Sequence, residues 1–143
     1  MKRLLLGTVS ALAFGCAPKM VEVDLSEAGL AATMQAPEGS TVERKPLGVM
    51  VTGEQFDLAV WNRTRDLDEE RARGNEDRYT LLVDEPDAVL LQHEAMGGPF
   101  YYATVNVDVG DESWSCATDP LANVDDEDGG HRMIEACRSL QAK

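Results

Sequence analysis

The acidic stretch 119–128 holds the densest group of potential metal ligands in the chain. Calcium takes about six to eight oxygen ligands, and an EF-hand loop supplies them at fixed positions. If the glycine after this stretch takes the glycine position of such a loop, Asp126, Asp128 and Glu135 fall on ligand positions. The first ligand position is then Val124, where an aspartate is needed, and no predicted helix leads into the loop. We therefore favour a solvated acidic loop; a weak calcium site at these three carboxylates is the alternative.

Residues that often carry enzymatic chemistry are present, but not in catalytic arrangements. His93 and Glu94 are neighbours on a predicted strand, where adjacent side chains point to opposite faces. Ser113 and Ser115 lack the glycine-flanked elbow of serine hydrolases. The sequence also contains no glycine-rich phosphate loop and no Cys-x-x-Cys motif of the kind found in zinc sites. We therefore predict no catalytic residue and no cofactor, and we interpret His93 as a structural histidine.

The start of the chain has the pattern of a secretory signal. Residues 1–3 are a short basic start, and residues 4–14 are uncharged and largely apolar. This apolar run is shorter than the about 20 residues that a membrane-spanning helix needs. It ends in Gly15-Cys16, which resembles the lipobox of bacterial lipoproteins. The resemblance implies that residues 1–15 are a signal peptide and that Cys16 is lipidated. The alternative is an ordinary signal peptide cut near Gly15, which leaves Cys16 as a plain thiol.

The lipobox resemblance also implies a location. An aspartate directly after the lipidated cysteine usually retains a lipoprotein at the inner membrane, and this chain has Ala17 there, which favours the outer membrane. The match departs from the commonest lipobox at Ala13, where leucine is usual. Two or three acyl chains anchor a protein durably, whereas one binds marginally. We expect a bacterial envelope protein in which residues 16–21 are the lipidated cysteine and a tether, and residues 22–143 are a single domain.

The remaining cysteines form an even set. If Cys16 carries lipid, Cys116 and Cys137 are left as a pair. Disulfides persist in exported proteins because their compartments are oxidising. Cys116 lies on a predicted strand, and Cys137 lies on the apolar face of the predicted helix that should cover it. We therefore predict a Cys116–Cys137 disulfide; two buried free thiols are the alternative.

The charge balance excludes some classes of partner. The formal net charge is −13, and removal of the signal would also remove Lys2 and Arg3. Such a surface repels nucleic acid, whose binding depends on neutralising phosphates with Lys and Arg. It also disfavours flat adsorption on anionic lipid. We expect the charge to keep the protein soluble, and we expect no nucleic-acid partner.

The hydrophobic pattern predicts an α+β domain. Alternating apolar residues and turn signals predict strands, and Asp66 with Glu69 begins a short middle helix. Near the C-terminus, Met133, Cys137 and Leu140 recur at helical spacing. We expect an antiparallel sheet of five to seven strands, with a short middle helix and a C-terminal helix packed on one face. The predicted strands are 21–25, 30–35, 47–51, 56–60, 79–83, 88–93, 101–109 and 113–118, and the predicted helices begin at 66 and near 130.

Aromatic residues on the predicted strands form a candidate interaction patch. Phe100 and Tyr102 should lie on the sheet face away from Val105, and Trp61 is a possible third member. An exposed aromatic patch marks an interaction site. Burial of Trp61, Phe100 and Tyr102 under a helix is the alternative, and we favour it slightly.

The order of segments resembles small bacterial lipoproteins of uncharacterised function. The resemblance rests on the early strand, the turn Ala36-Pro37-Glu38-Gly39, the hairpin, the acidic-capped helix and the closing Cys137-Arg138-Ser139-Leu140. More distantly, residues 22–141 are similar to PsbP/Mog1-like α+β domains. That resemblance implies a binding or assembly module with no catalytic residue. We expect a membrane-anchored, non-enzymatic binding or scaffold protein with an envelope protein as partner; the rival is an enzyme or enzyme accessory that uses acidic residues, with or without calcium.

Overall fold

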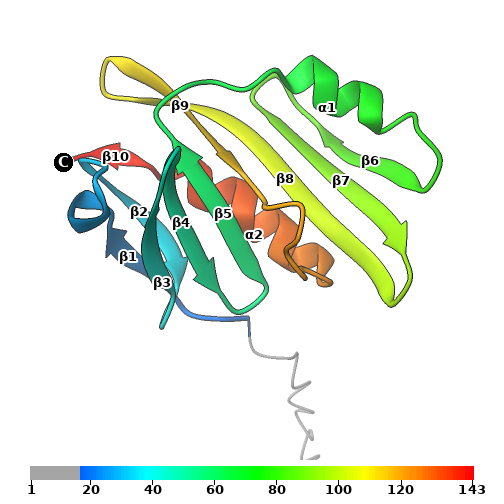
Figure 1. Cartoon of the computed structure of the whole chain (residues 1–143), viewed down its shortest axis with the longest axis horizontal. Helices are drawn as coiled ribbons and strands as arrows, with labels where there is room; N and C mark the ends of the chain where they lie inside the picture. The colour runs from blue at the N-terminus through cyan, green and yellow to red at the C-terminus, as the bar shows by residue number, and fades with distance from the viewer. Residues whose placement is uncertain (1–16) are drawn as a thin grey trace, which may run out of the picture.

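The computed structural model describes residues 17–143, so the expected signal peptide and Cys16 lie outside the described residues. The domain contains two antiparallel sheets (Figure 1). The larger sheet has seven strands in the order β3-β4-β5-β9-β8-β7-β6. These strands are β3 (Thr41–Lys45), β4 (Gly48–Gly53), β5 (Phe56–Trp61), β6 (Tyr79–Asp84), β7 (Ala88–Ala95), β8 (Gly98–Val109) and β9 (Glu112–Ala117).

The smaller sheet has three strands in the order β1-β2-β10, and it joins the beginning of the domain to its end. Its strands are β1 (Met20–Asp24), β2 (Ala32–Pro37) and β10 (Gln141–Ala142), and the 3-10 helix η1 (Ser26–Ala28) lies between the first two. The predicted α+β class with antiparallel strands is confirmed. The division into two sheets, and strands β3 and β10, were not predicted. β3 is mostly exposed and polar, and β10 has two residues, so neither shows an alternating apolar pattern.

Helix α2 (Glu127–Arg138) covers one face of the larger sheet. The Asp126 side chain caps it by accepting the Asp128 N–H at 3.2 Å, and acidic residues in the first turn suit the helix dipole. Met133, Ile134 and Cys137 point into the main core. Leu140, just beyond the helix, is also buried. The predicted packing of the C-terminal helix is therefore confirmed, and burial of each large apolar side chain contributes about 1.5–3 kcal/mol.

Helix α1 (Leu67–Arg73) lies on the opposite face of the larger sheet from α2, which differs from the expectation of helices on one face. Asp66 caps it by accepting the Asp68 N–H at 2.9 Å, as predicted. Its one buried residue, Leu67, packs with Val89 and Leu91 in a small second core. β7 is buried on both faces at this point, because α2 covers one side and α1 covers the other.

A disulfide links the sheet to α2. Cys116 on β9 is bonded to Cys137 on α2, with the two Cα atoms 6.0 Å apart. Both residues are completely buried. The predicted pairing is confirmed, and the alternative of two free thiols is not what the structure contains. Within residues 17–143, no helix is long and apolar enough to cross a membrane.

Candidate functional site

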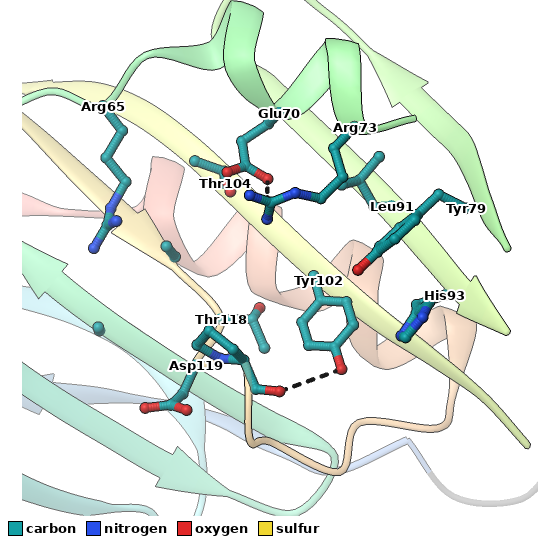
Figure 2. Close-up of a pocket in the computed structure, with 13 residues that line it drawn as sticks. Arg65, Glu70, Arg73, Tyr79, Leu91, His93, Tyr102, Thr104, Thr118 and Asp119 are labelled. Carbon is teal, nitrogen blue, oxygen red and sulfur yellow. Dashed lines mark hydrogen bonds and ion pairs between the residues drawn. The ribbon is translucent and has the colours of Figure 1, made fainter. Parts of the chain in front are cut away.

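A hollow of about 330 Å³ opens on the sheet face opposite α2. Figure 2 shows it between α1, the carboxyl end of β9 and the strands β6–β8. Its chemically active lining consists of Arg65, Arg73, Tyr79, His93, Tyr102 and Asp119. The hollow therefore combines charged groups of both signs with three rings.

Strand alternation explains why side chains from separate strands meet here. Tyr79 on β6 pairs with His93 on β7. Leu91 on β7 pairs with Tyr102 on β8, two residues from the position of His93. Residues two apart on a strand share a face, and paired residues lie side by side. Tyr79, His93 and Tyr102 are consequently brought together on the face that α2 does not cover.

Tyr79, His93 and Tyr102 form an aromatic wall at one end of the hollow. The rings of Tyr79 and His93 stack, with centroids 4.4 Å apart and planes 12° from parallel. The rings of His93 and Tyr102 lie 6.3 Å apart and are tilted by 46°. The Tyr102 hydroxyl donates to the Pro120 carbonyl at 3.4 Å. Burial is the main cause that raises the pKa of Tyr102, so its phenol stays neutral near pH 7.

Two arginines reach the hollow from the side of α1. Arg73 on α1 pairs with Glu70 at 3.4 Å. Arg65 precedes α1, and its backbone is held to the sheet by Asn106, which exchanges two hydrogen bonds of 2.9 Å with it. The Arg65 guanidinium lies 5.8 Å from the centre of the Trp61 ring, a cation–π distance. Among the described residues, no carboxylate forms an ion pair with Arg65.

Asp119 supplies negative charge at the rim beyond β9. One of its carboxylate oxygens accepts the Leu121 N–H at 2.8 Å. Its own N–H donates to the carboxylate of Asp57 at 3.2 Å. Burial is the main cause that raises the pKa of Asp57, and the negative charge of Asp119 raises it further. Asp57 itself does not line the hollow.

The hydroxyl groups that line the hollow belong to Tyr79, Tyr102, Thr104 and Thr118. Among residues 17–143, no serine or cysteine lines it, and the Thr118 hydroxyl already accepts the Ala103 N–H at 3.0 Å. Within the described chain, His93 forms no hydrogen bond or ion pair with a carboxylate; its ring stacks on Tyr79 instead. Within residues 17–143, no three His, Cys, Asp or Glu side chains converge on a common point.

The residues of the calcium alternative are not brought together as an EF-hand requires. Asp126 caps α2, and its second oxygen pairs with Arg132 at 3.0 Å. Glu135 lies on the exposed side of α2 and pairs with Arg138 at 2.9 Å. α2 begins at Glu127, so the segment expected to be a loop is helical and carries Asp128 and Glu135 about 10 Å apart along the axis.

The candidate aromatic patch is divided. Trp61, Phe100 and Tyr102 are half-buried on the same sheet face, but Tyr102 alone lines the hollow. Trp61 on β5 pairs with Ser115 on β9, and Ser115 pairs with Asn106 on β8, so Trp61 lies two strands away from β8. Asn106, the β8 residue level with Trp61, is four residues along the strand from Tyr102. That separation is about 10 Å across the strands and about 13 Å along them. Arg63 and Arg65 cover the Trp61 ring instead of an aromatic neighbour.

The sequence singled out Tyr102, His93 and, as the first residue of the acidic stretch 119–128, Asp119, but it did not indicate that Arg65, Arg73 and Tyr79 join them in one hollow. The predicted hairpin 79–83/88–93 could have placed Tyr79 opposite His93, because both strands were expected. Arg65 and Asp119 lie in loops 54 positions apart in the chain, and no local pattern connects them. No family model matches the chain, and no curated protein or solved structure is significantly similar to it.

Proposed function

We propose that this chain is a lipid-anchored envelope protein that binds a small organic ligand in the hollow lined by Tyr102, and that it is not an enzyme. The observation that carries the proposal is the convergence of three rings and charged side chains of both signs on one concave surface. Ligand sites typically combine a few placed polar groups with apolar and aromatic walls. The volume of the hollow, about 330 Å³, suits a small molecule rather than a folded partner.

Two further features support an exported protein. The Cys116–Cys137 disulfide is typical of proteins that work outside the reducing cytosol. The acidic balance suits a surface that stays soluble beside a membrane to which only its anchor is attached. Cys16 as the anchor, and the outer membrane as the location, are part of the proposal.

The anchor is tested by Cys16→Ala. We expect the variant to lose acyl mass and to move from the membrane fraction to the soluble fraction, because one thiol carries the whole attachment. The measurements are intact mass and fractionation after a high-salt wash. Acyl mass retained by the variant would contradict the lipobox interpretation.

The hollow is tested with a fragment library and NMR. We expect fragments to shift the amide signals of Tyr102 and Thr104, and Tyr102→Leu to weaken their binding at least ten-fold because it removes the central ring. Phe100→Leu is the matched control: Phe100 lies on the same strand and face but outside the hollow. If the two substitutions weaken fragment binding equally, the hollow is not the binding site.

The rival, an enzyme that uses acidic residues, has one observation in its favour. Asp57 and Asp119 are neighbouring carboxylates, and the pKa of Asp57 is raised. Perturbed carboxylates are common in catalytic sites. Asp57 does not line the hollow, however, and its shift is caused mainly by burial. Binding is therefore the better-supported function.

A further inference from the structure

We infer that the end of the domain where the chain enters is held against a zwitterionic phospholipid surface, with Met96 and Leu121 in contact with the lipid. This inference rests on the proposed function, since it requires a lipidated Cys16. Three observations carry it: the short chain between Cys16 and the domain, two strongly exposed apolar side chains at the same end, and the charge around them.

The chain between Cys16 and the first strand is too short to act as a spacer. β1 begins at Met20, and the Lys19 carbonyl already accepts the Glu38 N–H at 2.7 Å. Ala17 itself lines a cavity together with residues of the β4–β5 turn and of the start of α2. Consecutive Cα atoms are only about 3.8 Å apart. A lipidated Cys16 therefore holds this end of the domain at the bilayer surface.

The anchor end, as we call it, is the lower edge of the domain in Figure 1. It comprises the chain entry, the β4–β5 turn, the loop 118–126, the start of α2 and the β7–β8 turn. Two hydrogen bonds connect neighbouring segments there. The Gln55 side chain accepts the Asp125 N–H at 2.9 Å, and the Val124 carbonyl accepts the Tyr101 N–H at 2.8 Å near the start of β8. Loops from separate strands thus form one end of the molecule.

Two apolar side chains project from the anchor end. Met96, in the β7–β8 turn, is 99% exposed, and Leu121, in the loop 118–126, is 89% exposed. Their immediate neighbours carry no charge, since two glycines follow Met96 and Leu121 lies between Pro120 and Ala122. Transfer of exposed apolar surface from water to the boundary of headgroups and acyl chains is favourable. Together with the attachment point, the two side chains give three contacts, and three points define a plane such as a bilayer surface.

The charge of the anchor end selects the kind of lipid. Glu54, Asp125, Glu127 and Asp128 are exposed there, and Lys19 opposes them with one positive charge. Anionic headgroups repel such a surface over about a Debye length. Zwitterionic headgroups carry no net charge, so the anchor and the two apolar side chains determine the contact.

This contact also brings the hollow to the bilayer. Leu121 follows Asp119 and Pro120, both of which line the hollow. The rim formed by the loop 118–126 therefore lies beside the lipid surface. A ligand of the hollow then enters it close to the membrane interface.

The test is fluorescence quenching of the lipidated protein in phosphatidylcholine vesicles that contain brominated lipid. Met96→Trp and Leu121→Trp each report on one apolar contact. Leu47→Trp is the matched control, because Leu47 is 70% exposed but lies in the β3–β4 turn at the opposite end of the sheet. The native Trp61 and Trp114 also lie towards that end, so wild-type protein should not be quenched.

We expect Met96→Trp and Leu121→Trp each to lose roughly half of the added fluorescence, because tryptophan settles at the membrane–water interface. Leu47→Trp should lose none. A native-like circular dichroism spectrum and an intact disulfide first establish that each variant is folded.

A second set of vesicles tests the charge argument. When phosphatidylglycerol replaces part of the phosphatidylcholine, the quenching of Met96→Trp and Leu121→Trp should fall, and high salt should restore it by screening the repulsion. A rise in quenching with phosphatidylglycerol would overturn the inference, because anionic headgroups rather than apolar contacts would then hold this end.

The outcomes separate the inference from the proposed function. Equal quenching of Leu47→Trp and the other two variants would show that the domain has no fixed orientation, and quenching of none would show that there is no contact. Either result overturns the inference, while acyl mass on the protein leaves the proposed anchor standing. Envelope protein without acyl mass would overturn the anchor and, with it, this inference.

Discussion

At the scale of single residues, the fold shifts the pKa values of two aspartates in opposite directions. Asp57 is half-buried, and burial raises its pKa above the ordinary value of 3.8. Asp87 pairs with Arg138 at 2.8 Å, and hydrogen bonding to that guanidinium lowers the pKa of Asp87. Relative to the unfolded chain, folding therefore shifts Asp57 towards its protonated form and Asp87 towards its charged form. The two residues should make contributions to stability with opposite pH dependence.

Asp57→Asn should raise the thermal midpoint near pH 7. Since the folded pKa of Asp57 is raised, the folded state binds the proton more tightly, and its stability falls as the pH rises from 3.8 through the folded pKa. Asparagine removes that penalty and keeps an oxygen for the Asp119 N–H. Thermal melts between pH 3 and pH 8 measure the effect.

Asp87→Asn is the matched control for this experiment. Its lowered pKa contributes stability above pH 3.8 that is lost as the pH falls through the folded pKa, so this variant should melt at a lower temperature near pH 7. A shift of the same sign in both variants would mean that the two carboxyl groups do not act as described.

At the scale of elements, α2 supplies the side chains that cover the core face of the larger sheet. Met133, Ile134 and Cys137 pack against β5 and β8, and Leu140 continues the same buried stripe beyond the last turn. Gly130 lets the helix approach closely, because a Cβ there would meet the Leu90 side chain at 2.9 Å. The helix is thus fixed by side-chain packing along its whole length rather than by its intrinsic helix propensity.

Leu140→Asp should destabilise the domain by about 3–5 kcal/mol, because it removes a buried leucine and places a charge among apolar side chains. Leu140 is 4% exposed. Gln141→Asp is the control: it introduces the same residue at the next position, which is exposed. Urea denaturation measures both variants. A decrease in the free energy of unfolding of less than 1 kcal/mol for Leu140→Asp would contradict the placement of Leu140 in the core.

At the scale of the whole molecule, the disulfide ties two distant parts of the chain together. Cys116 lies on a central strand of the larger sheet, and Cys137 lies on the helix that covers it. The 21 residues of sequence separation include the loop 118–126 and the Asp119 rim of the hollow. The bond therefore restricts both the core and one edge of the proposed binding site.

Replacing both cysteines with alanine should lower the free energy of unfolding by about 3 kcal/mol, because a closed loop of this length restricts the unfolded chain. Wild-type protein unfolded in the presence of reductant should give the same urea midpoint as the double variant. Mass spectrometry of unreduced protein from the envelope provides the direct check. Free alkylation of both cysteines there would show that the bond is absent in its native compartment.

The sequence alone determined features encoded within short stretches. The alternation of Tyr101, Ala103 and Val105 predicted β8, and the spacing of Met133, Cys137 and Leu140 predicted α2 and its buried side. The Cys116–Cys137 pair followed from cysteine parity. These predictions succeeded because backbone periodicity and capping are local, so a few neighbouring residues are sufficient to specify them.

The tertiary structure alone decided which face α1 covers and where the hollow lies. α1 has a single buried residue, Leu67, so its amphipathic pattern could not indicate a side of the sheet. The hollow depends on the strand order β5-β9-β8-β7-β6, which brings Arg65, Asp119 and Tyr79 to one surface. Strand order and pairing arise from packing between distant segments, and a one-residue shift would move every side chain to the other face.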